Sequence, residues 1–364
     1  MKFLQKLGKA LMLPVAVLPI CGILMGIGYR LCPATMQGGD ISGAVNLIGL
    51  FLVKAGSALI DNMALLFAIG VGVGMSEKND GTGGIAALAS WLMITTLLST
   101  GVVTTIVPSI AESATKTLAF DKIENPFIGI LAGIIGSACY NRFKDTKLPD
   151  WLSFFSGKRC VAIVSGVVSI VVSVVLLFVW PVLFGVLVAL GEGIEKMGAV
   201  GAGIYAFFNR LLIPFGLHHV LASLVRFTEA GGTYMINGRE FVGILNATNE
   251  ILFNLGPDSE YWSQLMPTLT SYLGGAQMLT TLFRVPAIGL AMYHTAYAKN
   301  KKIAKGVILT CCLTAFLGNI TEPLEFSFLF ISPALFVLYC VMCGIGLLPY
   351  QLFHICIGYI RGTI

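Results

Sequence analysis

Two carboxylates lie in a strongly apolar part of the chain, within the segment 318–326. Glu322 and Glu325 are separated only by Pro323 and Leu324, and apolar runs lie on both sides. An acid at membrane depth is costly, so it is usually retained for a task. Pro323 has no backbone N–H and disfavours the α conformation at Glu322. The pattern predicts two helical pieces that meet here, with a carboxylate facing an internal cavity that suits a hydroxyl-rich ligand such as a sugar.

A second unusual segment ends in adjacent histidines. His218 and His219 follow Pro214 and Gly216 and are half of the 4 histidines in the chain. Proline and glycine here predict a broken helix or the tip of a re-entrant hairpin. Adjacent side chains point in different directions on a regular element, so we expect at least one imidazole to bind a ligand hydroxyl. The alternative is that backbone carbonyls satisfy both rings. No HExxH pattern or supporting carboxylate spacing accompanies them, so a metal site is not expected.

Two arginines flank the histidines in the sequence. Arg210 and Arg226 either extend toward lipid headgroups or pair with a buried carboxylate such as Glu322 or Glu325. Amides and hydroxyls that suit sugar binding occur at Asn209, Gln277, Asn319 and Thr321. Aromatic rings at positions 207, 208, 215, 326 and 328 suit the apolar face of a sugar, although ordinary core or lipid-facing packing is the favoured interpretation of any one of them. No GxSxG, Walker or metal-triad pattern is present, so we expect binding without a catalytic set or a cofactor.

The composition indicates a membrane protein. Of 364 residues, 56% are hydrophobic and 11% are charged, with a mean hydropathy of +0.87, whereas a soluble chain carries about a quarter charged residues. The 9 cysteines lie mostly in or beside apolar runs and are interpreted as packing residues; the pair Cys340 and Cys343 has no second pair to complete a metal site. The net charge of +5 is dispersed and does not indicate a nucleic-acid partner.

The elements that must position these residues are predicted to be helices. We expect an all-α polytopic membrane protein with about nine to ten transmembrane segments plus re-entrant hairpins. The apolar runs are 11–29, 44–60, 63–75, 85–107, 127–140, 161–190, 200–216, 279–297, 307–320 and 326–348. Several are shorter than the roughly 20 residues that cross hydrocarbon, and the run 161–190 is expected to be interrupted at Trp180-Pro181. Short and broken runs are typical of transporters around a midplane site.

Charged and polar segments set the expected topology. Three clusters of lysine and arginine are predicted to be cytoplasmic by the positive-inside rule. They are Lys2, Lys6 and Lys9; Arg142, Lys144, Lys147, Lys158 and Arg159; and Lys299, Lys301, Lys302 and Lys305. The N-terminus is expected to form a short interfacial helix. The polar region 228–268 is expected to be a lid or an extracytoplasmic loop, and the glycine-rich stretch 70–74 to pack helices rather than bind a nucleotide.

Together these residues resemble the membrane (IIC) subunit of bacterial phosphoenolpyruvate-dependent sugar phosphotransferase systems, in the glucose superfamily. The resemblance covers nearly the whole chain, at 8–15, 66–71, 140–143, 147–150 and 154–159. Its most specific motifs are NRLLIPFGLHH at 209–219 and ITEPLEF at 320–326. The residues 224–233 look most like the maltose/glucose branch.

The resemblance implies a function and a set of site residues. The chain would carry a sugar across the bacterial cytoplasmic (inner) membrane as a multi-pass protein, and a phosphorylated IIB domain or protein would phosphorylate that sugar. It would therefore form a sugar phosphotransferase only together with IIB. Glu322 with His218 or His219 would bind sugar hydroxyls. The full expected set of substrate-binding residues is Glu322, His218, His219, Thr321, Asn319, Arg210 and Arg226.

The resemblance also implies an organisation for the chain. We expect a single IIC domain over 1–364, with a scaffold and dimerisation half at 1–190, a sugar-binding transport half at 191–364, and a homodimer in the membrane. No IIA or IIB domain is recognised, and the chain is expected to end before the last membrane segment of the family. The expected substrate is a glucoside, maltose or glucose. The alternatives are an N-acetylglucosamine-specific IIC, a proton- or sodium-coupled secondary transporter that uses Glu322, and a membrane protein without transport activity.

Overall fold

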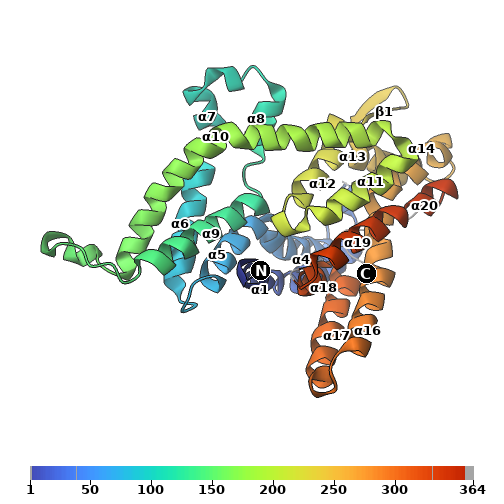
Figure 1. Ribbon diagram of the computed structural model, residues 1–364. Coiled ribbons are helices and arrows are strands. Elements are labelled where there is room, and N and C mark those ends of the chain that lie inside the picture. Colours follow the sequence, from blue (N-terminus) through green and yellow to red (C-terminus); the bar gives the residue numbers. More distant parts are fainter. Residues whose placement is uncertain (1, 38, 330, 357–364) are drawn as a thin grey trace. The chain divides into compact units, whose positions relative to one another are not determined.

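A computed structural model describes residues 2–37, 39–329 and 331–356 of the chain (Figure 1). The chain forms two compact units, each assembled from segments that are far apart in the sequence. Unit 1 contains Met1–Pro14, Asn62–Leu190 and Pro214–Leu221, and unit 2 contains Val15–Asp61, Gly191–Ile213 and Ala222–Ile364. The roles of scaffold and transport halves, expected at 1–190 and 191–364, stay predictions.

Unit 1 is built around three helices that pack closely on one another. These are α5 (Met63–Gly74), α6 (Gly81–Leu97) and α9 (Pro126–Phe143). Glycines permit the close approach: a Cβ added to Gly136 would lie 2.4 Å from the backbone N of Ala87. The glycine-rich stretch 70–74 lies in α5, as the packing interpretation predicts. The other elements are α1 (Lys2–Val15), α7 (Thr100–Ile106), η1 (Pro108–Ile110), α8 (Ala114–Asp121), η2 (Asp150–Phe155) and α10 (Lys158–Lys196), whose last residues belong to unit 2.

The expected interruption of the run 161–190 is wrong. Helix α10 continues for 39 residues through Pro181. A proline removes one intrahelical hydrogen bond, but its neighbour Trp180 is fully buried and anchors the helix. The Trp180 Nε1 donates a hydrogen bond to the Ala119 carbonyl at 2.7 Å, and its ring packs against Phe127 and Phe184. Side-chain packing therefore keeps this proline within a continuous helix.

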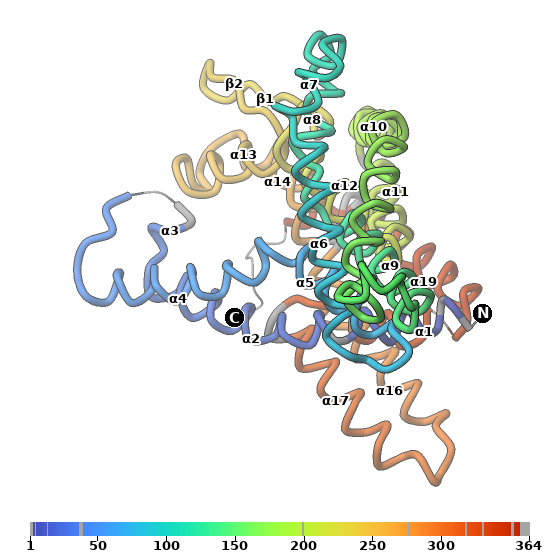
Figure 2. The backbone as a smooth tube through the Cα atoms, turned by 90° about the vertical axis from the view of Figure 1, so that its left-hand side faces the viewer, coloured from blue at the N-terminus to red at the C-terminus, as the bar shows by residue number. Residues whose placement is uncertain are grey.

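Unit 2 is a set of helix hairpins and irregular helical turns. Helix α2 (Leu18–Leu31) packs on α4 (Ala44–Asp61), α11 (Gly198–Leu211) packs on α19 (Pro333–Ile345), and α16 (Val285–Thr295) packs on α17 (Lys301–Gly318). Figure 2 shows α16 and α17 side by side. The remaining helices are α3 (Ala34–Gln37), α13 (Ile244–Asn249), α14 (Glu260–Thr270), α15 (Ala276–Leu279), α18 (Glu322–Leu329), α20 (Leu348–Leu352) and α12 (His218–Phe227), whose first residues belong to unit 1.

Short non-α turns connect these helices. The 3₁₀ turns are η3 (Ile213–Phe215), η4 (Glu229–Gly231) and η8 (Ala298–Asn300), and the π-helical turns are η5 (Glu250–Leu255), η6 (Ser271–Gly275) and η7 (Thr280–Arg284). Across α16, α17 and α18, a small core contains Val285, Cys311, Ala315 and Leu324. Cys311 therefore acts as an apolar packing residue, as the sequence predicts.

The polar region 228–268 contains a hairpin that the all-α expectation omits. Strand β1 (Thr233–Ile236) pairs antiparallel with β2 (Arg239–Val242), and Ile236 lies opposite Arg239. The two residues between them, Asn237 and Gly238, both have positive φ, at 50° and 74°. Asn-Gly favours the tight two-residue turn of a hairpin, so this dipeptide is the sequence signal for the strands.

The long apolar helices identify segments that can cross a membrane. Among the described residues, three are long and apolar enough: Ala44–Asp61, Lys158–Lys196 and Pro333–Tyr350. Two further pairs, α6 with α7 and α8 with α9, are each bent by 56° and are either broken spans or re-entrant loops. Length and composition thus support three to five spans. The larger number of nine to ten stays a prediction.

Candidate functional site

The segment around Glu322 is a break between two helices, which confirms the prediction made from Pro323. Helix α17 ends at Gly318, and Asn319 follows in the left-handed conformation with φ 57°. Helix α18 begins at Glu322, and Pro323 occupies its first turn, where its missing N–H leaves no hydrogen bond unmade. A carboxylate in the first turn interacts favourably with the helix dipole. The backbone therefore places Glu322 at the start of a helix, beside an irregular three-residue link.

A buried hydrogen-bonded network holds this link in unit 2. The Arg210 Nη1 donates to Glu325 Oε1 at 2.9 Å and to Thr321 Oγ1 at 2.8 Å, and its Nη2 donates to Gln277 Oε1 at 2.7 Å. The Gln277 Nε2 in turn donates to the Asn319 carbonyl at 3.1 Å. One arginine and one amide thus connect α11, α15 and the start of α18.

Glu325 is the carboxylate that this network neutralises. It accepts hydrogen bonds from Arg210, from Thr321 Oγ1 at 3.1 Å and from Tyr339 OH at 2.5 Å. The side chains of Arg210 and Glu325 are only 4% and 1% exposed. The ion-pair interpretation of Arg210 is therefore correct, and extension toward headgroups is not. A buried charge pair needs such additional hydrogen bonds because desolvation offsets much of the Coulombic attraction.

The two carboxylates of the segment differ in accessibility. Glu325 is fully buried, whereas Glu322 is partly exposed. Thr321 is also buried, and its hydroxyl is engaged by Arg210 and Glu325. The segment therefore combines a fully buried acid that is neutralised by Arg210 with an acid whose residue is partly exposed although its Oε2 is buried.

The histidine segment is a second helix break, as Pro214 and Gly216 predict. Helix α11 ends at Leu211, the turn η3 contains Pro214, and α12 begins at His218. Gly216 has φ 69°, and a Cβ there would lie 2.9 Å from the Pro126 side chain. A glycine is thus required both for the backbone conformation and for the close approach of α9.

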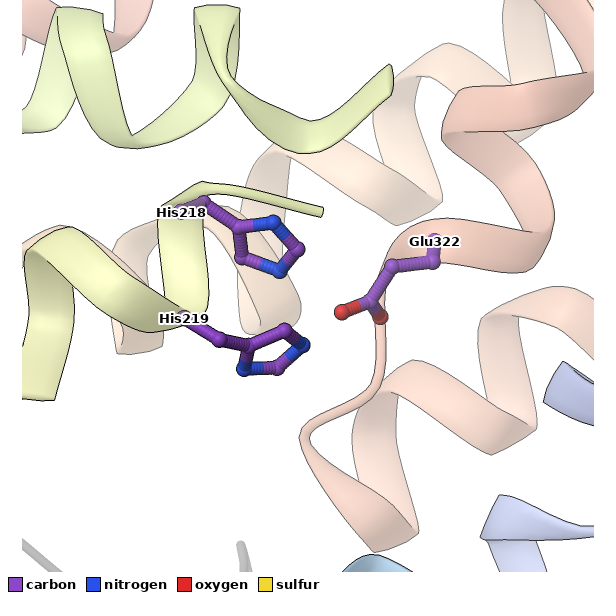
Figure 3. Close-up of side chains that lie close together, drawn as sticks. All are labelled: His218, His219 and Glu322. Atoms are coloured by element: carbon purple, nitrogen blue, oxygen red, sulfur yellow. The ribbon is translucent and has the colours of Figure 1, made fainter. Parts of the chain in front are cut away.

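The two imidazoles lie closer together than the sequence predicts. Their ring centroids are 3.9 Å apart, at an interplanar angle of 40°, although adjacent side chains on a helix diverge by about 100°. Rotation of the side chains in the first turn of α12 brings the rings together. Figure 3 shows both rings projecting from this turn, and the Glu322 side chain at the start of α18. The first residues of α12 belong to unit 1, and Glu322 belongs to unit 2.

The other predicted residues fall in two places. Arg210, Thr321 and the Asn319 carbonyl belong to the network around Glu325. Arg226 lies in the last turn of α12, where a cation interacts favourably with the helix dipole. Phe328 packs edge-on against Tyr339, at 5.5 Å between ring centroids, so its aromatic ring serves packing. Tyr339 was not recognised from the sequence because it lies within a uniformly apolar run.

Comparison with known proteins agrees with these features. A family model described as "Phosphotransferase system, EIIC" matches residues 8–344. The N-acetylglucosamine-specific EIICB component of the phosphotransferase system of Bacillus subtilis (strain 168) is 36% identical over 95% of this chain. In Escherichia coli (strain K12), the maltose-specific EIICB component is 32% identical over 100% of the chain, and the N-acetylglucosamine-specific EIICBA component is 34% identical over 98%.

The aligned regions cover 65%, 70% and 48% of these three relatives, respectively. The similarity thus extends through almost all of this chain and through about half to two thirds of each relative. The matched region includes both helix breaks and the ion pair of Arg210 with Glu325. The chain belongs to the EIIC family of the phosphotransferase system.

Proposed function

We propose that this chain is the sugar-binding translocation subunit of a phosphoenolpyruvate-dependent phosphotransferase system. The observation that carries the proposal is the contrast between the two acids of the segment 318–326. Arg210 neutralises Glu325 inside unit 2, and Glu322 is a partly exposed residue at the start of α18. A carboxylate on an ordered helix terminus is a strong acceptor for sugar hydroxyls.

The proposed binding set combines direct ligands with residues that order them. Glu322 would accept hydrogen bonds from the sugar, and His218 and His219 would supply donors or acceptors from the first turn of α12. Thr321, Asn319 and Arg210 would position Glu322 through the network around Glu325, and Arg226 completes the set expected from the sequence. Such a set grips hydroxyl groups but contains no activated nucleophile.

The sugar is proposed to contain a glucose-type ring. Two of the similar relatives are named for N-acetylglucosamine and one for maltose. The residues 224–233 favour maltose or glucose, and the names of these relatives favour N-acetylglucosamine equally well. Binding measured with all three sugars in competition will distinguish these substrates.

The phosphoryl donor is proposed to be a phosphorylated IIB domain or protein on the cytoplasmic side of a bacterial inner membrane. The described part of the chain supplies hydrogen-bonding groups for a sugar, and the Glu322 carboxylate would repel a phosphate. The subunit is proposed to act as a homodimer. Phosphorylation of the sugar would therefore require IIB, and the chain alone would bind sugar without modifying it.

Replacement of Glu322 by Gln tests this proposal. The amide keeps the shape and removes the charge, so sugar affinity should fall by about tenfold to a hundredfold. Binding is measured by titration calorimetry on folded protein.

The matched control is Glu229→Gln in η4, at an exposed acid of unit 2. It should leave affinity unchanged. Equal affinities for wild type and Glu322→Gln would contradict the proposal. Uptake of unmodified sugar that depends on a proton or sodium gradient would instead support the secondary-transporter alternative, with Glu322 as the coupling acid.

A further inference from the structure

An apolar groove lies between α16, α18 and α19, and it meets the network around Glu325 at Tyr339, which belongs to both. Its volume is about 490 Å³, and its lining includes Ala291, Phe328, Leu335, Leu338 and Tyr339. This volume is typical of sites for small apolar ligands, which run from roughly 300 to 1,000 Å³. The groove therefore has the size and the lining of a binding site.

The groove follows one face of each of two helices. Along η7 and α16 its lining residues recur from Arg284, the last residue of η7, through Ala287 and Ala291 to Thr295, a helical spacing of about 16 Å end to end. On α19 the lining residues Leu335, Leu338 and Met342 are each more than half exposed. Helix α19 belongs to a segment long and apolar enough to cross a membrane, so this long apolar groove opens toward hydrocarbon.

Arg284 is the one charged residue among those that line the groove. Its Nη1 donates to Thr280 Oγ1 at 3.1 Å, and within the described ranges no carboxylate forms a salt bridge with it. Its guanidinium also lies against Gly346: a Cβ on that glycine would be 1.8 Å from Arg284 Nη2. The cation is half-buried, and a charge in such a place is costly without a counter-ion.

We propose that the groove binds an anionic glycerophospholipid, with one acyl chain between α16 and α19 and the phosphate at Arg284. An acyl chain matches the length and the apolar walls of the groove. A phosphate supplies the negative charge that no carboxylate of the described chain supplies to Arg284, and guanidinium groups bind phosphate oxygens through paired hydrogen bonds. None of the residues proposed to bind the sugar lines this groove, and the proposal does not depend on them.

Lipid binding to the purified full chain tests the proposal. Delipidated protein in a neutral detergent is titrated with phosphatidylglycerol or phosphatidylcholine of the same acyl chains, and bound lipid is counted by native mass spectrometry. Wild type should prefer phosphatidylglycerol by about tenfold, because the choline cation of the zwitterion offsets the phosphate charge that faces Arg284. Arg284→Gln should abolish the preference, whereas Arg239→Gln, at an exposed cation of β2, should retain it.

Two further variants separate the acyl chain from the headgroup. Ala291→Leu fills the groove and should lower the binding of both lipids, with the fold verified by circular dichroism. Gly346→Ala displaces the Arg284 guanidinium without removing its charge. It should reduce the preference for phosphatidylglycerol and leave the binding of phosphatidylcholine unchanged. Equal preference in wild type and Arg284→Gln would overturn the proposal. So would displacement of the lipid by millimolar inorganic phosphate, or a change of oligomeric state in Ala291→Leu with lipid binding intact.

Discussion

The chain forms ion pairs in two contrasting environments. In unit 1, Glu77 pairs with Lys144, and Asp80 pairs with Lys158 at 2.6 Å. Glu77 and Lys158 are each 57% exposed, and their partners Lys144 and Asp80 are 10% and 23% exposed, so one side of each pair faces solvent. In unit 2, Arg210 and Glu325 are almost completely buried and share their remaining hydrogen bonds with Thr321, Gln277 and Tyr339. The exposed pairs connect turns at the ends of helices. The buried pair instead holds the backbone next to Glu322, the residue proposed to bind the sugar.

This difference in environment sets the expected energetic difference. Exposed pairs contribute little because water and salt screen them and the long side chains lose entropy. A buried pair contributes little net stability when intact, but loss of one partner leaves an uncompensated charge in a medium that solvates it poorly. We therefore expect a larger loss of stability when the pair in unit 2 is broken than when a pair in unit 1 is broken. Equal losses would show that the two environments differ less than the exposure of their side chains indicates.

The largest effect is expected for Arg210→Met. It leaves Glu325 buried beside Thr321 and Tyr339 without a cation, and breaking such a pair costs about 3–5 kcal/mol. Thermal unfolding of the purified protein in detergent measures the change. The double variant Arg210→Met with Glu325→Gln removes both charges and should recover most of the loss. A single variant as stable as wild type would show that the pair is dispensable.

The sequence predicts the two helix breaks but not the network between their residues. Pro214 with Gly216, and Pro323 before Leu324, indicate where helices cannot continue, because local sterics decide the outcome. The choice of Glu325 over Glu322 as the partner of Arg210 depends on packing between segments more than 100 residues apart. Tyr339 lies 14 residues from Glu325, and Gln277 lies 67 residues from Arg210; these contacts also depend on tertiary packing, which local sequence patterns do not encode.

The structure differs from the sequence prediction at two other places, for different physical reasons. Pro181 should end a helix by local rules, yet α10 continues because Trp180 is anchored to the Ala119 carbonyl. The Asn237-Gly238 turn, in contrast, is a local signal that the expectation of an all-helical chain overlooked. Local chemistry therefore predicts breaks and turns well, and tertiary packing decides which proline is tolerated and which acid is neutralised.

An intermediate effect is expected at Asp80 in unit 1. Its Oδ1 accepts the Thr82 backbone N–H at 2.9 Å at the start of α6, and its Oδ2 accepts the Tyr140 hydroxyl at 2.7 Å. Asp80→Ala removes this helix cap and should cost about 1 kcal/mol. Asp80→Asn retains a capping side chain and should cost less. Both variants remove the charge, and only Asp80→Asn keeps a capping side chain. Equal unfolding temperatures would therefore show that the capping hydrogen bond adds no stability of its own.

The same carboxylate gives a pH dependence with a defined sign. The hydrogen bond from Lys158, together with those from Tyr140 and Thr82, holds the pKa of Asp80 well below its usual range. A lowered pKa in the folded state adds stability at pH values above the unfolded pKa of about 3.9, and this stability is lost as pH falls below it. The unfolding temperature of wild type should therefore fall more steeply below about pH 4 than that of Asp80→Asn. Parallel curves for the two proteins would contradict this assignment.

The smallest effect is expected for Lys144→Gln. Lys144 pairs with Glu77 and lies 5.7 Å from the centre of the Tyr140 ring, but its partner carboxylate faces solvent. Lys144 lowers the pKa of Glu77 by hydrogen bonding and charge, and solvent screening leaves little of that interaction as stability. The unfolding temperature should stay within the scatter of repeated measurements, and any small loss should vanish in high salt. A loss of unfolding temperature that salt does not change, and that is as large as the loss for Arg210→Met, would show that Lys144 acts through packing on Tyr140. The difference between the ion pairs of the two units would then reflect buried contacts and not buried charge.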